Sequence, residues 1–176
     1  VLRQAQAEML EWGKARASVM EVSHRGKEFV ACAEEAERDL RELLDVPANY
    51  KVLFLQGGAT QHFAQIPMNL ARRDQRADYV LTGDWSEKAL KEAKPLVRAH
   101  VAASAADTNY DRVPARASWD LDPQSAYVHV TPNETIRGVE FADIPEVGDV
   151  PLVADLSSTI LSRPLDVARY GLIYAG

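Results

Sequence analysis

The stretch ADYVLTGDWSEKALKEAKPLVRAHVA, residues 77–102, decides the fold class. Its first five residues are mostly apolar and predict a buried strand over 77–81, and residues 85–93 have the spacing of a helix. A second apolar run predicts another strand over 96–102. A strand, a helix and a second strand in close succession indicate a parallel pair with a helical crossover, the unit from which α/β domains are built.

The same alternation continues on both sides of this unit. Other short apolar runs predict strands at 51–55, 126–130, 152–154 and 172–174, and helical periodicity predicts helices at 2–12, 27–44 and 59–70. We therefore expect an α/β fold, a mostly parallel sheet flanked by helices, over residues 1–176. Ligands of such sheets bind beyond the carboxyl ends of the strands, so the residues that follow each strand are the candidates for a site.

Composition and charge exclude several classes of protein. With 47% hydrophobic and 26% charged residues among 176, the chain resembles an ordinary soluble globular domain. It contains no run of 18 apolar residues, so we expect no membrane span, and its net charge of −6 argues against binding nucleic acid. The single cysteine, Cys32, fits a reducing cytoplasm and is expected to be a packed, inert thiol. The four histidines lack the spacing of metal ligands.

A glycine pair at 57–58 follows the predicted strand 51–55 and precedes a helix. Glycines allow a tight turn, after which the N–H groups of Ala59, Thr60 and Gln61 are expected to face outward as a cradle for phosphate. The segment lacks the Gly-Lys-Ser/Thr ending of a P-loop, which argues against a nucleotide. A plain turn is the alternative interpretation.

Three other predicted strand ends carry residues suited to a ligand. Trp85 follows 77–81 and offers either a core side chain or a flat face for a ring. The segment 131–138 is rich in hydroxyls and turn formers, and Asp155 ends the strand 152–154, where it either caps a helix or pairs with a cationic ring nitrogen. A phosphate cradle, a flat ring, a hydroxyl and a carboxylate together meet the needs of pyridoxal phosphate.

Longer motifs resemble those of the phosphoserine aminotransferase family. They are SVMEVSHRGKEF at 18–29, FLQGGAT at 54–60, GDW at 83–85, PNETIRG at 132–138 and ADLSSTILSRP at 154–164. They follow the family's order and span nearly the whole chain. The resemblance implies the large domain of a fold-type I, class-V aminotransferase that uses pyridoxal 5′-phosphate and acts as a cytoplasmic homodimer.

The resemblance also implies an activity. The family moves an amino group between glutamate and 3-phosphohydroxypyruvate in serine biosynthesis, and in many bacteria it also serves pyridoxine (vitamin B6) biosynthesis. By position, His24 and Arg25 resemble the residues that bind substrate. An arginine suits this role because its guanidinium binds carboxylate or phosphate groups with two hydrogen bonds.

The same comparison by position assigns the cofactor contacts. Ala59 and Thr60 resemble the phosphate-binding residues, and Trp85 resembles the ring that stacks on the cofactor. Thr135 resembles the partner of the phenolic oxygen, and Asp155 resembles the partner of the ring nitrogen. Some family members carry arginine where Thr60 stands, so this chain offers a hydroxyl and a backbone N–H in place of a charge.

The resemblance places the lysine that holds the cofactor, and a C-terminal small domain, beyond Gly176. None of the six lysines matches that position; they are Lys14, Lys27, Lys51, Lys88, Lys91 and Lys94. We therefore expect residues 1–176 alone to be inactive. Two alternatives are another fold-type I enzyme, such as a cysteine desulfurase, which would share Asp155 without needing His24 and Arg25, and a non-catalytic truncated fragment.

Overall fold

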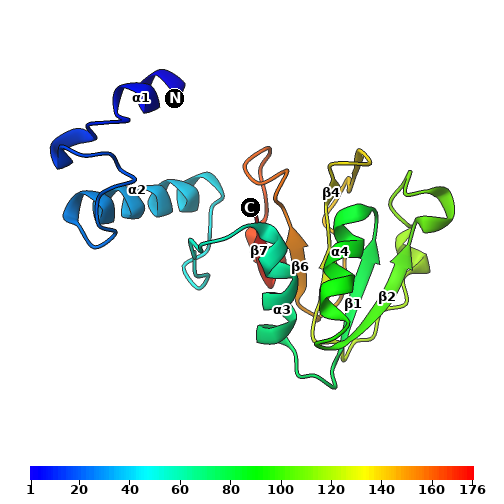
Figure 1. The fold of residues 1–176 in the computed structure, drawn as a ribbon. Helices are drawn as coiled ribbons and strands as arrows, with labels where there is room; N and C mark the ends of the chain where they lie inside the picture. The colour runs from blue at the N-terminus through cyan, green and yellow to red at the C-terminus, as the bar shows by residue number, and fades with distance from the viewer. The chain divides into compact units, whose positions relative to one another are not determined.

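The computed structural model describes residues 1–176 as two compact units, 1–52 and 53–176. The first unit contains α1 (Leu2–Ala7), the 3₁₀ turn η1 (Gly13–Ala15) and α2 (Lys27–Leu43) (Figure 1). The helix predicted over 2–12 is shorter than expected, because the chain bends after α1 and reaches Gly13 with a positive φ of 52°. Cys32 lies exposed on α2, so the prediction of a packed thiol is wrong.

The second unit is built on a sheet of five parallel strands in the order β2-β1-β3-β6-β7. The strands are β1 (Arg76–Leu81), β2 (Arg98–Ser104), β3 (Val128–Val130), β6 (Leu152–Asp155) and β7 (Leu172–Tyr174). A separate antiparallel ribbon pairs β4 (Asn133–Glu134) with β5 (Val139–Glu140). The predicted α/β class with a parallel sheet is confirmed.

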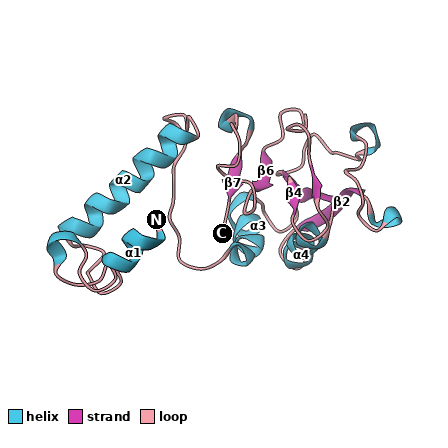
Figure 2. Ribbon diagram, turned by 90° about the horizontal axis from the view of Figure 1, so that it is seen from above, coloured by secondary structure: helices cyan, strands magenta, loops and turns pink.

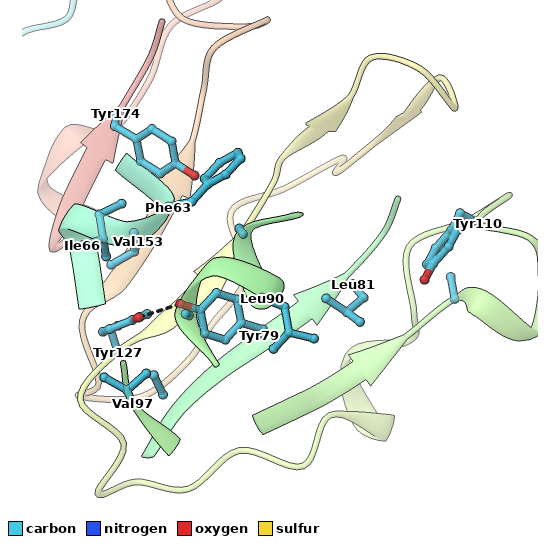
Figure 3. Close-up of a cluster of buried hydrophobic side chains, with 14 residues drawn as sticks. Phe63, Ile66, Tyr79, Leu81, Leu90, Val97, Tyr110, Tyr127, Val153 and Tyr174 are labelled. Carbon is cyan, nitrogen blue, oxygen red and sulfur yellow. Dashed lines mark hydrogen bonds between the residues drawn. The ribbon is translucent and has the colours of Figure 1, made fainter. Parts of the chain in front are cut away.

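Helices α3 (His62–Leu70) and α4 (Asp84–Ala93) lie side by side against one face of this sheet (Figures 1 and 2). Their apolar side chains and those of the strands form a core; in Figure 3 they include Phe63, Ile66 and Val153. The opposite face packs against the irregular segments 105–125 and 141–170, through residues such as Trp119 and Phe141. Strands buried on both faces explain why their sequences are almost continuously apolar.

The strand predicted at 51–55 is wrong. The chain there forms no strand, and Leu53, Phe54 and Leu55 are 71%, 63% and 56% exposed. The apolar run predicted burial, but a strand also needs a hydrogen-bonded neighbour, and this segment pairs with neither edge of the sheet. Strand β2 starts two residues later than predicted, because the N–H groups of Leu96 and Val97 still bond to Ala93 in the turn after α4.

None of the helices is both long and apolar enough to cross a lipid bilayer.

Candidate functional site

The carboxyl ends of β1, β3, β6 and β7 meet along one edge of the sheet, because neighbouring strands are parallel. Asp155 ends β6 and is the register partner of Tyr174 on β7. Just beyond β7 the chain touches the glycine turn: a Cβ atom on Gly176 would lie 2.5 Å from the backbone nitrogen of Ala59. The structure thus brings the predicted phosphate cradle and the predicted carboxylate to the same edge.

Asp155 is buried, with only 6% of its surface exposed, and it forms no ion pair with a lysine or arginine. Its Oδ1 accepts hydrogen bonds from the backbone N–H of Ser157 at 3.0 Å and from the Ser157 hydroxyl at 2.6 Å. Asp155 therefore caps the turn after β6, although no helix begins there. Since both bonds fall on Oδ1, the second carboxylate oxygen receives nothing from Ser157.

Two buried polar rings lie behind Asp155. His129 on β3 is 1% exposed, and its Nε2 lies 2.9 Å from the hydroxyl oxygen of Tyr174. Burial lowers the pKa of His129 to about 4, and the nearby charge of Asp155 only partly opposes this. Burial and the nearby charge of Asp155 raise the pKa of Tyr174. Both rings are therefore neutral near pH 7.

We expect the free energy of unfolding to fall as the pH drops from 7 to 5.5, in part because of His129. In the unfolded chain its imidazole takes up a proton near pH 6.5, whereas in the folded chain it stays neutral until about pH 4. This group therefore contributes its full stability above pH 6.5 and loses it below. Urea unfolding should show a decrease that is about 1 kcal/mol smaller in His129→Gln. Equal decreases in both proteins would contradict the assigned burial of the neutral ring.

The glycine turn has the shape expected of a phosphate cradle, but it offers two free N–H donors where three were predicted. Gly57 has a φ of 107°, a conformation that favours glycine. The predicted free N–H of Gln61 is wrong, because it donates to the carbonyl of Gly58 at 3.0 Å within the 3₁₀ turn η2 (Ala59–Gln61). The N–H groups of Ala59 and Thr60 form no hydrogen bond, and they remain as the two candidate donors.

Trp85 lies in the first turn of α4 and is half-buried against the core that α3 and α4 cover. The ammonium group of Lys88, one turn further along, sits 4.0 Å from the centroid of the indole. One face of the ring is thus taken by a cation. The packing against the core agrees with the core interpretation, and the role of Trp85 as a platform for a ligand ring stays a prediction that needs the other face of the indole.

Glu134 is a site residue that the sequence did not reveal. It is fully buried, and its carboxylate accepts hydrogen bonds from the N–H groups of Trp85 at 3.0 Å and Ser86 at 2.9 Å and from the Ser86 hydroxyl at 2.7 Å. A Cβ atom on Gly83 would lie 2.7 Å from this carboxyl group, so the glycine makes room for it. The negative charge also suits the amino end of α4. Through these hydrogen bonds, Glu134 links the β4–β5 turn, which carries Thr135, to the first turn of α4, which carries Trp85.

The structure does not test the predicted roles of three further site residues, all of which are exposed. Thr135 is exposed at the tip of the β4–β5 ribbon, directly after Glu134. His24 and Arg25 are exposed in the N-terminal unit, in the segment that leads to α2. There the N–H of Arg25 donates to the hydroxyl of Ser23 at 3.2 Å.

The chain is similar to known proteins along its whole length. The family model described as aminotransferase class-V matches residues 1–176. Phosphoserine aminotransferases from Hahella chejuensis and Stenotrophomonas maltophilia are 60% and 59% identical to it over 176 residues, which are 100% of this chain and 49% of each relative. The chain therefore spans about half the length of the curated relatives it matches.

Solved structures agree with this similarity. A phosphoserine aminotransferase from Bacillus circulans subsp. alkalophilus superposes with a TM-score of 0.94 at 49% identity, over 99% of this chain and 48% of the other. A PLP-bound phosphoserine aminotransferase from Trichomonas vaginalis gives a TM-score of 0.91 at 42% identity, over 99% of this chain and 49% of that one. With the full-length family match, these findings show that the chain belongs to the class-V aminotransferase family.

Proposed function

We propose that this chain is the cofactor-binding part of a phosphoserine aminotransferase and that it binds pyridoxal 5′-phosphate at the carboxyl edge of its sheet. The observation that carries the proposal is the buried carboxylate of Asp155, which has hydrogen bonds on one oxygen and no cationic side chain as a partner. A buried carboxylate of this kind is costly unless a cation meets it. A protonated pyridine nitrogen supplies that cation.

The other residues at this edge fit the rest of the cofactor. The free N–H groups of Ala59 and Thr60 bind the phosphate, and the face of Trp85 turned away from Lys88 stacks on the pyridine ring. The hydroxyl of Thr135 binds the phenolic oxygen. When bound, pyridoxal phosphate supplies an electron sink for the α-carbon of an amino acid, and the negative charge of Asp155 keeps the ring in its protonated, electron-accepting form.

For the whole protein we propose amino transfer between glutamate and 3-phosphohydroxypyruvate, by a cytoplasmic homodimer. High identity to phosphoserine aminotransferases over all 176 residues supports this assignment. His24 and Arg25, both exposed, contribute donors for the anionic groups of the substrate. In a protein that carries this chain at the full length of its relatives, 3-phosphohydroxypyruvate should be preferred to unphosphorylated keto acids, and equal rates would argue against the substrate assignment.

Cofactor binding by this chain should quench the fluorescence of Trp85. A ring stacked on the indole accepts its excitation at contact distance, so titration with pyridoxal 5′-phosphate is expected to lower the emission in a saturable way. Trp85→Phe should remove most of this change while keeping an aromatic face. Trp119→Phe is the matched control, because Trp119 packs against the opposite face of the sheet and should leave the quenching intact. Unchanged quenching in Trp85→Phe would contradict the assigned platform.

A further inference from the structure

We propose that Arg137 is a positioning residue for Thr135, because its ion pair with Asp84 fixes the tip of the β4–β5 ribbon to the first turn of α4. The proposal rests on the proposed function for the group that the Thr135 hydroxyl meets, the phenolic oxygen of the cofactor. It explains how an exposed residue on a short ribbon keeps a fixed place. The anchoring of the ribbon itself depends on no ligand.

The ribbon needs an anchor beyond its own pairing. Strands β4 and β5 have two residues each and pair only with one another. A two-stranded hairpin by itself is marginally stable at best in water. The N–H groups of Arg137 and Gly138 close the turn by donating to the carbonyl of Glu134 at 3.0 and 2.8 Å. These bonds set the shape of the turn, so side chains have to fix its place.

Two side chains on either side of Thr135 in the sequence do this. Glu134 accepts hydrogen bonds from N–H groups in the first turn of α4. Arg137 reaches the same turn, where its Nε donates to Oδ2 of Asp84 at 2.6 Å. Asp84 is the first residue of α4 and directly precedes Trp85. Thr135 therefore lies between two anchors that both end on the turn that carries the proposed ring platform.

The guanidinium group of Arg137 is also held by the segment 105–112, which follows β2. Its Nη1 donates to Oδ1 of Asn109 at 3.3 Å, and its central carbon lies 5.8 Å from the ring centroid of Tyr110. Tyr110 belongs to the buried cluster in Figure 3, and its hydroxyl donates to Glu87 on α4. The planar fork of an arginine thus bridges three segments, which the single point charge of a lysine would not do.

The backbone beneath this guanidinium is strained. Asn109 and Tyr110 both have left-handed φ angles, of 56° and 58°. This conformation is unfavourable for residues other than glycine, and most of all for a bulky side chain. Such strain persists where the surroundings over-determine it. The contacts of this pair with Arg137 and of Tyr110 with Glu87 supply that constraint.

The ion pair has the strength that a positioning role requires. The side chains of Arg137 and Asp84 are each 32% exposed, and the hydrogen bond from Arg137 lowers the pKa of Asp84, so both are charged at pH 7. A pair that solvent partly screens contributes modestly to stability. Its loss should therefore loosen the ribbon without unfolding residues 53–176.

The first test measures the anchoring and needs no ligand. Amide hydrogen exchange of Gly138 in the ¹⁵N-labelled chain reports opening of the turn, because this N–H donates to Glu134. Asp84→Asn leaves the sequence of the ribbon unchanged and should speed this exchange about 3- to 10-fold. Asp111→Asn is the matched control, because it removes the same charge from an exposed ion pair with Arg112. Unchanged exchange in Asp84→Asn would overturn the proposal.

The second test measures the effect on the phenolic oxygen. Pyridoxal 5′-phosphate is compared with 3-deoxypyridoxal 5′-phosphate, which lacks that oxygen. Arg137→Gln and Thr135→Val should each weaken binding of the first compound by about 3- to 10-fold and leave binding of the second unchanged. The double variant should lose no more than Thr135→Val, because Arg137 acts through Thr135. Arg137→Lys should fall between Arg137→Gln and the unmodified chain.

The control for the second test is Arg112→Gln. It removes the same charge from an arginine that pairs with Asp107 and Asp111 in the segment 105–112, and it should leave both affinities unchanged. A general disturbance of the fold by Arg137→Gln would weaken both compounds alike, and this result would refute the positioning role.

The outcomes separate the two proposals. If neither compound binds the unmodified chain, the proposed function fails and the role toward the phenolic oxygen fails with it, while the exchange of Gly138 still decides whether the ribbon is anchored. If pyridoxal 5′-phosphate binds and Arg137→Gln does not discriminate between the compounds, the positioning role is refuted and the proposed function stands. If Thr135→Val leaves both affinities unchanged, Thr135 does not meet the phenolic oxygen and the inference is wrong.

Discussion

Replacing Glu134 by glutamine should lower the free energy of unfolding of residues 53–176 by about 2–4 kcal/mol. The carboxylate accepts three hydrogen bonds, from two N–H groups and one hydroxyl, in a fully buried place. A glutamine keeps the shape but turns an NH₂ group toward donors, so at least one buried donor loses its partner at about 1–3 kcal/mol. The loss of negative charge at the amino end of α4 adds to this.

Urea unfolding followed by tryptophan fluorescence measures the change, because Trp85 and Trp119 both lie in this unit. Glu140→Gln is the matched control: it stands on the paired strand β5, opposite Asn133, and its ion pair with Arg163 is exposed. Such a pair is worth at most about 1 kcal/mol. If the two variants lost the same stability, Glu134 would not be the clamp that joins the ribbon to α4.

Replacing Asp155 by asparagine should weaken the binding of pyridoxal 5′-phosphate to this chain by about 10- to 100-fold. Asparagine keeps the size of the side chain and an oxygen for the hydrogen bonds from Ser157. It removes the negative charge, and a charge-assisted hydrogen bond of this kind contributes about 1.5–3 kcal/mol. The ring nitrogen should also lose its proton at a lower pH, which separates this cause from a general disturbance of the fold.

Calorimetric titration at pH 7 provides the affinity. Asp149→Asn removes the same charge from an exposed position of the same unit and should leave the affinity nearly unchanged, since exposed charges are screened by solvent and salt. Equal weakening in both variants would point to the net charge of the chain as the cause. Unchanged affinity in Asp155→Asn would remove the central support of the proposed function.

The sequence by itself determined the fold class and most of the elements of the second unit. The strand predicted at 172–174 and the helix predicted at 85–93 match β7 and α4 to within a residue. These predictions succeeded because the spacing of apolar residues within a segment is a local property of the sequence. Each of these segments is long or apolar enough for that spacing to indicate a helix or a strand. The position of Asp155 at a strand end was predictable for the same reason.

The tertiary structure alone decided which of these residues meet. Glu134 bonds to a residue 48 positions away, and His129 contacts one 45 positions away. The order and register of strands set both contacts, and no local pattern encodes them. The same limit explains the error at 51–55, where the apolar run indicated a preference for burial but could not supply the neighbouring strand that a sheet requires.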